Sequence, residues 1–368
     1  MKKTLAALAV LGAFAGSAFA ANVTLYGIID TGLDYSQTKV DGAKSTHKFE
    51  MGTGSHDASR FGLKGVEELG NGLKVGFVLE NGFKSDTGSL GVDKTIFDRE
   101  AQVYIEGAFG KLGAGRLGQL DSGNGSYALF GGAVAPYSTG LTNVPGHKYV
   151  MGATFGRYDN MLAYQTPTFA GFTGYAQYSF GKSADKTDDA TAYVEGKSST
   201  DRFAALGLKY ANGPLNVSAV VSQINAKSDM DHDVDDPLAV SLGGAYDFGV
   251  AKLYASGQYF KDYTLAVGAL NAAAIAKQFE GFGINVGVAI PVLAGTVKLD
   301  TGYMDAEASA DNDKREMDRF TFGAGYEYPL SKRTLAYVGV GYYQDNYKNT
   351  TEKDAKFYGA TCGISHKF

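Results

Sequence analysis

The chain lacks tryptophan and has one cysteine, Cys362, and only 7 prolines among its 368 residues. A single cysteine excludes an internal disulfide, so an exported protein of this sequence must be held together in another way. Beyond residue 20 the chain also lacks an apolar run long enough to cross a bilayer as a helix. A helical membrane protein is therefore excluded. A membrane barrel is not, because its strands hide their apolar residues in alternation.

Residues 1–20 have the three parts of a secretory signal. Lys2 and Lys3 supply the basic part, an apolar stretch follows, and small residues lead to Ala20. The alternative, a transmembrane anchor, needs about 20 apolar residues, and this stretch is shorter. We therefore expect cleavage between Ala20 and Ala21, which leaves residues 21–368 as one mature domain.

The mature chain is short of basic residues. Without the two lysines of the signal, 32 basic residues remain against 39 acidic ones, a net charge of −7. This balance argues against nucleic acid as a partner. The five histidines show no pair at zinc-binding spacing, and we expect neither a metal site nor a cofactor.

Alternation of apolar and polar residues begins directly after the signal. In residues 22–35, Val23, Leu25 and Leu33 share one parity, and polar residues such as Asp30 take the other. A period of two over so many residues indicates a β-strand. The same pattern recurs in about eight hairpins, hence about sixteen strands, and it continues to the last residue.

Short turns and long polar loops alternate along the chain. An Asn-Gly pair at residues 71–72 indicates a tight hairpin. Further short turns are expected at residues 107–111, 166–170, 211–214, 248–251, 290–295 and 329–333. Long loops are expected at residues 36–57, 84–96, 118–154, 182–200, 225–237, 261–278, 306–317 and 345–355.

These features predict an all-β fold, a transmembrane antiparallel β-barrel of about sixteen strands with an apolar outer face and a polar inner face. Short turns at one end and long loops at the other are typical of outer-membrane barrels, whose turns are periplasmic and whose loops are external. We therefore expect the protein in the cell outer membrane.

Several blocks of sequence carry a family resemblance. They are residues 22–27 (NVTLYG), 59–65 (SRFGLKG), 67–74 (EELGNGLK), 110–112 (GKL), 115–117 (GRL), 164–172 (YQTPTFAGF), 330–334 (LSKRT) and 363–368 (GISHKF). The blocks span the mature chain in order. Through them the chain resembles the Gram-negative trimeric general porins of Neisseria-like and related β-proteobacteria.

The resemblance implies a homotrimer of barrels, each a water-filled channel for passive diffusion of small hydrophilic solutes and ions. It implies that the loop at residues 118–154 folds into the lumen and that residues 84–96 form a latch between subunits. It also implies that Ile364, His366 and Phe368 form a C-terminal signal for the barrel-assembly machinery, which inserts the chain among outer-membrane lipid and lipopolysaccharide.

The resemblance also assigns the narrowest part of the channel. Arg60, Arg99 and Arg157 match the family's basic cluster, with Lys64 and Arg116 as neighbours. Parity turns Arg60, Lys64 and Arg157 inward. Arg99 and Arg116 share parity with apolar residues and would face lipid, which costs about 2–4 kcal/mol at the bilayer midplane. A bulge, a loop position or a different strand start would turn these two inward.

Charged rings at the narrowest point of a channel govern which ions pass. Asp121 is the only carboxylate of the loop at residues 118–154, and we expect it at the constriction beside the basic residues. A modest anion preference is therefore expected despite the negative net charge, because charges more than about 8–10 Å away are screened in physiological salt.

Two other functions are alternatives at this point. An outer-membrane enzyme needs a nucleophile near a base, and no Ser-His or Asp-His spacing indicates one. An adhesin binds a partner through its loops while its lumen is closed. Residues 113–118 match a dinucleotide pattern, but a loop follows in place of the required helix. Asp231, Asp233, Asp235 and Asp236 lack the glycine and distal glutamate of a calcium loop.

Overall fold

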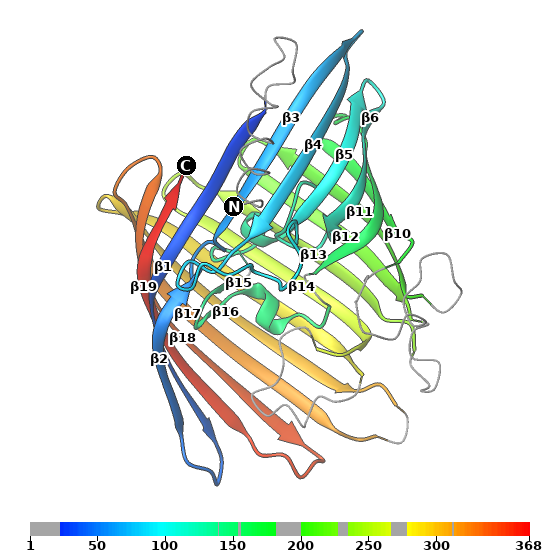
Figure 1. Ribbon diagram of the computed structural model, residues 1–368. Coiled ribbons are helices and arrows are strands. Elements are labelled where there is room, and N and C mark those ends of the chain that lie inside the picture. Colours follow the sequence, from blue (N-terminus) through cyan, green and yellow to red (C-terminus); the bar gives the residue numbers. More distant parts are fainter. Residues whose placement is uncertain are drawn as a thin grey trace.

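The computed structural model shows a closed β-barrel with part of the chain folded inside it (Figure 1). It describes residues 23–138, 140–153, 156–181, 200–226, 235–265, 278–310 and 313–368. The predicted signal and its cleavage site, Ala20 and Ala21, lie outside these residues. Most of the loop expected at residues 182–200 also lies outside them, as do Asp231 and Asp233.

The wall consists of strands in simple up-and-down order, and short elements lie between β6 and β9. In chain order the elements are β1 (Thr24–Val40), β2 (Thr46–Thr53), β3 (Arg60–Gly70), β4 (Leu73–Gly82), β5 (Glu100–Gly107), β6 (Gly110–Gly118), η1 (Gly131–Ala133), β7 (Gly140–Leu141), β8 (Val144–Pro145), η2 (His147–Val150), β9 (Arg157–Gln165), β10 (Phe172–Ser179), β11 (Arg202–Asn212), β12 (Leu215–Asn225), β13 (Leu238–Asp247), β14 (Lys252–Tyr263), β15 (Phe279–Val292), β16 (Gly295–Ala308), β17 (Glu316–Pro329), β18 (Thr334–Lys348) and β19 (Ala355–Lys367).

The first and last strands close the barrel. β1 pairs with β19 in antiparallel register from Ile28 opposite Lys367 to Val40 opposite Ala355. The described residues form one sheet of 17 strands, of which β2 and β3 both pair with β1. β2 and β3 pair with successive parts of β1, so they lie end to end and count as one strand of the wall. The barrel therefore has sixteen strands around its circumference. The predicted fold class and strand number are confirmed.

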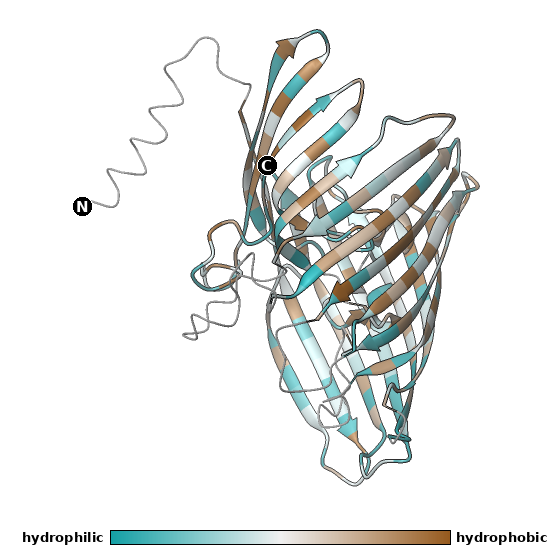
Figure 2. Ribbon diagram, turned by 90° about the vertical axis from the view of Figure 1, so that its right-hand side faces the viewer, coloured by the Kyte–Doolittle hydropathy of each residue, from teal (hydrophilic) through white to brown (hydrophobic). Residues whose placement is uncertain are grey.

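The two faces of the wall differ as the alternation predicts. In β15, Phe282 and Ile284 are 47% and 53% exposed on the outside, whereas Asn285, next in the pleat, is 1% exposed and points inward. Figure 2 shows hydrophobic and hydrophilic bands alternating along the strands. Because lipid cannot hydrogen-bond to backbone groups, the closed ladder and the apolar outer face together allow the chain to span a bilayer.

The short turns lie where the sequence predicts them. Between β3 and β4, Asn71 and Gly72 both have positive φ, 53° and 77°. These are the values that a two-residue hairpin of the favoured twist requires, and Asn-Gly adopts them at little cost. Residues 113–118, with the dinucleotide-like pattern, lie in β6 and precede a loop. Neither of the two 3₁₀ helices among the described residues is long and apolar enough to cross a membrane.

The prediction of one long loop at residues 36–57 is wrong. β1 continues to Val40, a turn at residues 41–45 follows, and β2 returns along β1 from Thr46 to Thr53. Near its turn this hairpin is mostly polar, with an ion pair between Lys48 and Glu50, because only the part of a strand within the hydrocarbon needs apolar alternation. Strands at the same end, such as β16 and β17, also extend into regions expected as loops.

Candidate pore constriction

The chain between β6 and β9, residues 119–156, runs inside the barrel, and we call it the inner loop. It contains η1, η2 and the small β7–β8 ladder. It crosses the inward faces of the wall strands from β11, where Leu129 lies beside Gly207, to β19, where Asn143 lies beside Gly359. The long loop that the sequence predicts in this region therefore occupies the lumen.

Two inward glycines show how the wall accommodates the inner loop. A Cβ atom on Gly283 of β15 would overlap the carbonyl oxygen of Val150. A Cβ atom on Gly323 of β17 would lie 2.9 Å from Val144 Cγ1 and 3.0 Å from the Pro145 carbonyl oxygen. Neither glycine has a positive φ, so these positions need glycine for space, which allows close approach of a second backbone.

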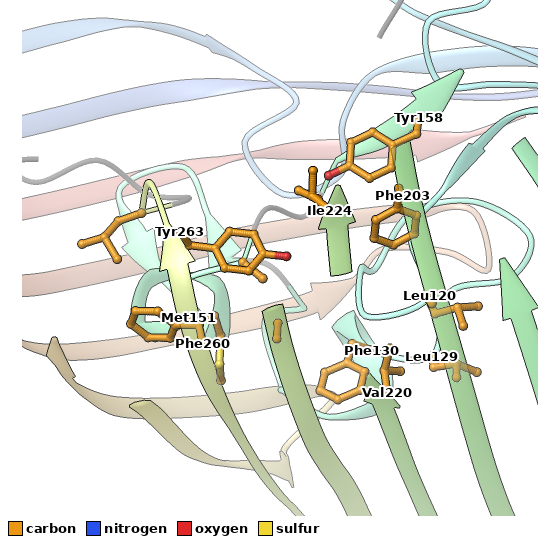
Figure 3. Close-up of a cluster of buried hydrophobic side chains, with 14 of the residues drawn as sticks. Leu120, Leu129, Phe130, Met151, Tyr158, Phe203, Val220, Ile224, Phe260 and Tyr263 are labelled. Atoms are coloured by element: carbon orange, nitrogen blue, oxygen red, sulfur yellow. The ribbon is translucent and has the colours of Figure 1, made fainter. Parts of the chain in front are cut away.

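Apolar side chains fasten the inner loop to the wall. In Figure 3, Phe130 and Met151 of the loop lie among Phe203 of β11, Val220 of β12 and Phe260 of β14. All five are buried. Because burial of apolar area contributes roughly 25 cal/mol per Å², this cluster holds the loop against the wall within a water-filled barrel.

Polar contacts fix the far part of the loop. Arg319 of β17 and Asp345 of β18 form an ion pair with neither side chain exposed, at 2.6 Å between Arg319 Nε and Asp345 Oδ1. Arg319 Nη1 also donates to the Tyr149 carbonyl oxygen in η2 at 3.1 Å. Six residues along β16 from the partner of Arg319, the Tyr137 hydroxyl donates to the Lys298 carbonyl oxygen at 2.6 Å. The loop is therefore tied to the wall at several separate points.

Arg60 and Arg99 meet at one carboxylate on the opposite part of the wall. Arg99 Nε donates to Glu80 Oε1 at 2.6 Å, and Arg60 Nε lies 3.6 Å from Glu80 Oε2. The Tyr26 hydroxyl also donates to Glu80 Oε2, at 3.0 Å. Arg99 faces the lumen because it precedes β5, which begins at Glu100. Its strand parity therefore does not apply, and the lipid-facing alternative is wrong.

A β-bulge lies opposite Arg116. The register of β6 on β9 shifts between Gly115 and Leu117, where Arg116 alone faces two residues of β9, Asp159 and Asn160, so the extra residue of the bulge belongs to β9. Arg116 Nη1 donates to Asp159 Oδ1 at 2.5 Å, and Arg116 Nε donates to the Asp98 carbonyl oxygen at 2.7 Å. Arg116 keeps its regular register on β5, opposite Ala101, and its charge is paired with Asp159.

Arg157 joins the same group from the first position of β9. Its Nη2 donates to Asn124 Oδ1 of the inner loop at 3.1 Å. Arg99 is close enough to both Arg157 and Arg60 for their like charges to interact. Lys64 lies further along β3, with its Nζ 5.2 Å from the centroid of the Tyr26 ring. The structure thus brings the five predicted basic residues to one region of the wall.

Asp121 does not line the open lumen, so that prediction is wrong. Its side chain is buried between the inner loop, to which it belongs, and the wall, at 1% exposure. Asp121 Oδ2 accepts a hydrogen bond from the Ser222 hydroxyl of β12 at 3.3 Å. Burial raises the pKa of the Asp121 carboxyl to about 6. The sequence cannot show this burial, because the residue follows no strand alternation and its apolar neighbours come from distant strands.

Comparison with known proteins identifies the family. A model of the Gram-negative porin family matches residues 6–349. This chain belongs to that family. The porin is 35% identical to an outer membrane porin protein of Bordetella pertussis over 404 aligned positions, which cover all of both chains. It is 28% identical over 377 positions, again covering both chains, to the major outer membrane protein P.IB of Neisseria meningitidis serogroup A.

Among solved structures, the porin is similar to the anion-selective porin from Comamonas acidovorans. The TM-score is 0.68 at 25% identity, and the match covers 95% of this chain and 100% of the other. The family resemblance predicted from sequence blocks is therefore confirmed. Family and fold are those of an outer-membrane channel rather than an enzyme.

The C-terminal residues of the porin lie at the seam of the barrel. The Phe368 backbone N–H donates to the Gly27 carbonyl oxygen at 3.0 Å, and the Phe368 ring is 47% exposed. Ile364 faces outward at 49% exposure, and His366 Nδ1 lies 2.9 Å from the Thr334 hydroxyl. Ile364 and His366 are both exposed, whereas Ser365 between them is buried, so they share the outward face of β19.

Two acidic residues of the site are absent from the sequence-based assignment. Glu80 and Asp159 contact the arginines, although only the tertiary structure brings them together. Alternation in residues 73–83 does place Glu80 inward, so an inward carboxylate on a strand next to an inward arginine is a usable signal. A further inward segment, residues 54–59, falls largely within residues 36–57, which were expected as an external loop.

Proposed function

We propose that this porin passes small anions more readily than cations, and that Arg60, Arg99 and Arg157 set this preference. The observation that carries the proposal is their convergence from three places in the sequence onto one part of the inner wall, beside the inner loop. The similar Comamonas porin, described as anion-selective, supports the same conclusion.

The physical basis is the position of these charges inside a narrow, water-filled passage. Fixed charges at a constriction act on ions within a few ångströms, whereas loop charges beyond about 8–10 Å are screened in physiological salt. Glu80 offsets part of the positive potential because it is shared by Arg60 and Arg99. A modest anion preference follows, without binding of a specific solute. Other small hydrophilic solutes diffuse through the same passage.

Reversal potentials in a salt gradient across a planar bilayer test the proposal. With Arg60, Arg99 and Arg157 all replaced by Gln, we expect the chloride-to-potassium permeability ratio to fall by at least about fivefold, because three nearby positive charges are removed. A cation preference in the unmodified porin contradicts the proposal outright.

A matched control removes the same charge elsewhere. Lys39, Lys44 and Lys48 are exposed on the β1–β2 hairpin. Lys39 lies eleven residues along β1 from Ile28, the partner of Arg60, which is roughly 35 Å at about 3.3 Å per residue. Replacing these three lysines by Gln should leave the permeability ratio unchanged. If both triple variants change the permeability ratio equally, net charge sets the selectivity and the assignment to the arginines is wrong.

We also propose that the porin is a homotrimer, with residues 84–96 as the latch between subunits. In support, Val92 and Ile96 of this loop are exposed, and the loop begins beside β2, where the Ser85 backbone N–H donates to the Thr53 hydroxyl at 2.6 Å. Exposed apolar residues in a loop favour contact with a partner. Cross-linking of intact cells tests the proposal: Val92→Asp with Ile96→Asp should reduce the trimer, and an unchanged trimer contradicts the latch.

For biogenesis we propose export with cleavage between Ala20 and Ala21, followed by recognition of Ile364, His366 and Phe368 by the barrel-assembly machinery. The apolar outer wall then contacts membrane lipid and lipopolysaccharide. The exposed outward positions of Ile364 and Phe368 at the seam support the C-terminal assignment. Mass spectrometry of the mature chain tests the cleavage site, and outer-membrane levels of a Phe368→Ser variant test the signal.

A further inference from the structure

A short insertion separates β2 from β3, the two strands that lie end to end beside β1. β2 pairs with β1 as far as Thr53 opposite Thr31, and β3 resumes with Arg60 opposite Ile28. Only two residues of β1 lie between these pairs, whereas six residues lie between Thr53 of β2 and Arg60 of β3. We call residues 54–59 the inner insertion, because this excess leaves the sheet and its contacts are with inward-facing side chains.

Two buried carboxylates of β1 hold the inner insertion. Asp30 Oδ2 accepts from the Asp57 backbone N–H at 3.1 Å, and Asp34 Oδ2 accepts from the Ser55 hydroxyl at 2.9 Å. Asp30 and Asp34 are 0% and 3% exposed. The Ser59 hydroxyl and the Asp30 backbone also exchange hydrogen bonds, at 3.0 Å each. A segment with this many charge-assisted contacts has a defined position.

The inner insertion extends over the neighbouring strands of the wall. His56 Nε2 lies 2.7 Å from Glu327 Oε1 of β17, which β1, β19 and β18 separate from β2 in the wall. On its other side, His56 Nδ1 lies 3.0 Å from Asp57 Oδ2. Burial alone would lower the pKa of His56, but these two carboxylates outweigh it and raise the pKa to about 9. The imidazolium and Glu327 therefore form an ion pair at neutral pH, which fixes the tip of the insertion.

The inner insertion also meets the inner loop. The Thr142 backbone N–H donates to the Ser55 carbonyl oxygen at 2.8 Å. The inner loop starts beside Arg157 and crosses the wall to this contact, and the insertion continues from it back to Arg60. The two segments together therefore form a band inside the barrel that begins and ends at the arginine cluster.

One residue of the insertion is exposed and has no side-chain contact with the wall to hold it. Ala58 is exposed, whereas Ser55 and Ser59 are buried and His56 and Asp57 are engaged with the wall. The Ala58 carbonyl oxygen accepts from Arg60 Nη1 at 2.9 Å. This contact places residue 58 directly beside an arginine of the constriction.

We propose that the inner insertion is the second half of the constriction, and that the size and charge of residue 58 set conductance and ion preference. A small, neutral side chain leaves the passage beside Arg60 open. A larger or charged group at residue 58 obstructs it or changes its potential. The proposal needs only an open channel and is independent of the assignment of anion preference to the arginines.

Thiol modification at residue 58 tests the proposal in the full-length porin. In a Cys362→Ser background, Ala58→Cys is treated with anionic 2-sulfonatoethyl methanethiosulfonate while single channels are recorded. We expect a stepwise loss of about a third or more of the conductance at each modified channel. Complete labelling, shown by mass spectrometry, without a change in conductance overturns the proposal.

Leu293→Cys in the same background is the matched control. Leu293 lies in the turn between β15 and β16 and is 98% exposed, so it should be labelled with no effect on conductance. If Leu293→Cys is labelled and Ala58→Cys is not, residue 58 does not face the lumen and the proposal is overturned.

Charge at residue 58 supplies a second readout. Ala58→Lys and Ala58→Glu should shift the reversal potential in opposite directions, each by about a threefold change in permeability ratio. Equal reversal potentials for the two variants overturn the proposal. If the intact porin prefers cations but both variants still shift as expected, the arginine assignment fails while the role of the insertion stands.

Discussion

The inner wall of this porin has two parts that differ in what they present to the lumen. The part from β3 to β9 carries long charged side chains, with Arg60, Arg99 and Glu80 in mutual contact. The part from β13 to β19 carries glycines such as Gly283 and Gly323, and the inner loop covers it. The same strand alternation produces both parts, so the inward residue type decides whether the wall faces water or a second layer of chain.

The difference explains how a wide barrel becomes a narrow and charged passage. Glycine removes side-chain volume from one part of the wall, which lets the backbone of the inner loop approach closely. The loop then takes up lumen volume on that side and confines the passage toward the arginines. The covered part thus sets the width, and the uncovered part sets the electric field.

The largest effect should come from filling the glycine-lined wall. Gly283→Val places side-chain atoms where the Val150 carbonyl lies, and we expect a loss of about 3 kcal/mol of stability together with a changed conductance. Gly257→Val is the control, since an added Cβ there meets its nearest atom at an ordinary 3.4 Å. Unfolding followed by circular dichroism in detergent compares them, and equal stability of both variants contradicts the role of the glycine.

A smaller effect is expected from the carboxyl buried under the inner loop. The pKa of Asp121 is raised from its ordinary value of 3.8 to about 6, so the folded state holds this proton more tightly than the unfolded chain. Its contribution to stability is therefore complete below about pH 4 and is lost as the pH rises through about 6, by roughly 2–3 kcal/mol. Asp121→Asn should abolish this dependence.

The measurement is the difference in unfolding temperature between the wild-type porin and Asp121→Asn at pH 4 and at pH 7. Every other group that titrates in this interval is present in both proteins, so its contribution cancels in the difference. The unfolding temperature of the variant should increase relative to that of the wild type as the pH rises. A difference that stays constant across the interval contradicts burial of the carboxyl under the loop.

The smallest effect should arise in the uncovered part of the wall. Glu80→Gln removes the negative charge shared by Arg60 and Arg99, so anion preference should increase by about threefold in permeability ratio. Asp247→Asn, at the exposed end of β13, makes the same change of charge far from the cluster and should have no effect. A Glu80→Gln porin with unchanged reversal potential shows that this carboxylate does not act on the permeating ions.

Much of the fold follows from local patterns. The strand periodicity, the short turns and the outward face of β19 are all properties of neighbouring residues, so the sequence shows them directly. Arg99 marks the limit of this reasoning. Its orientation depends on the residue at which β5 begins, and pairing with another strand decides that start.

The sequence by itself determined a chain with two chemically different faces, hence a membrane barrel, and it supplied the basic residues that we propose for the constriction. The tertiary structure alone decided how the inside is filled. The inner loop and the inner insertion show no periodicity, because their contacts come from strands distant in the chain. Asp30, Asp34 and Gly283 appear in the sequence as ordinary inward residues. They acquire roles only when a second layer of backbone packs against them, since space and hydrogen-bond partners there come from tertiary contacts.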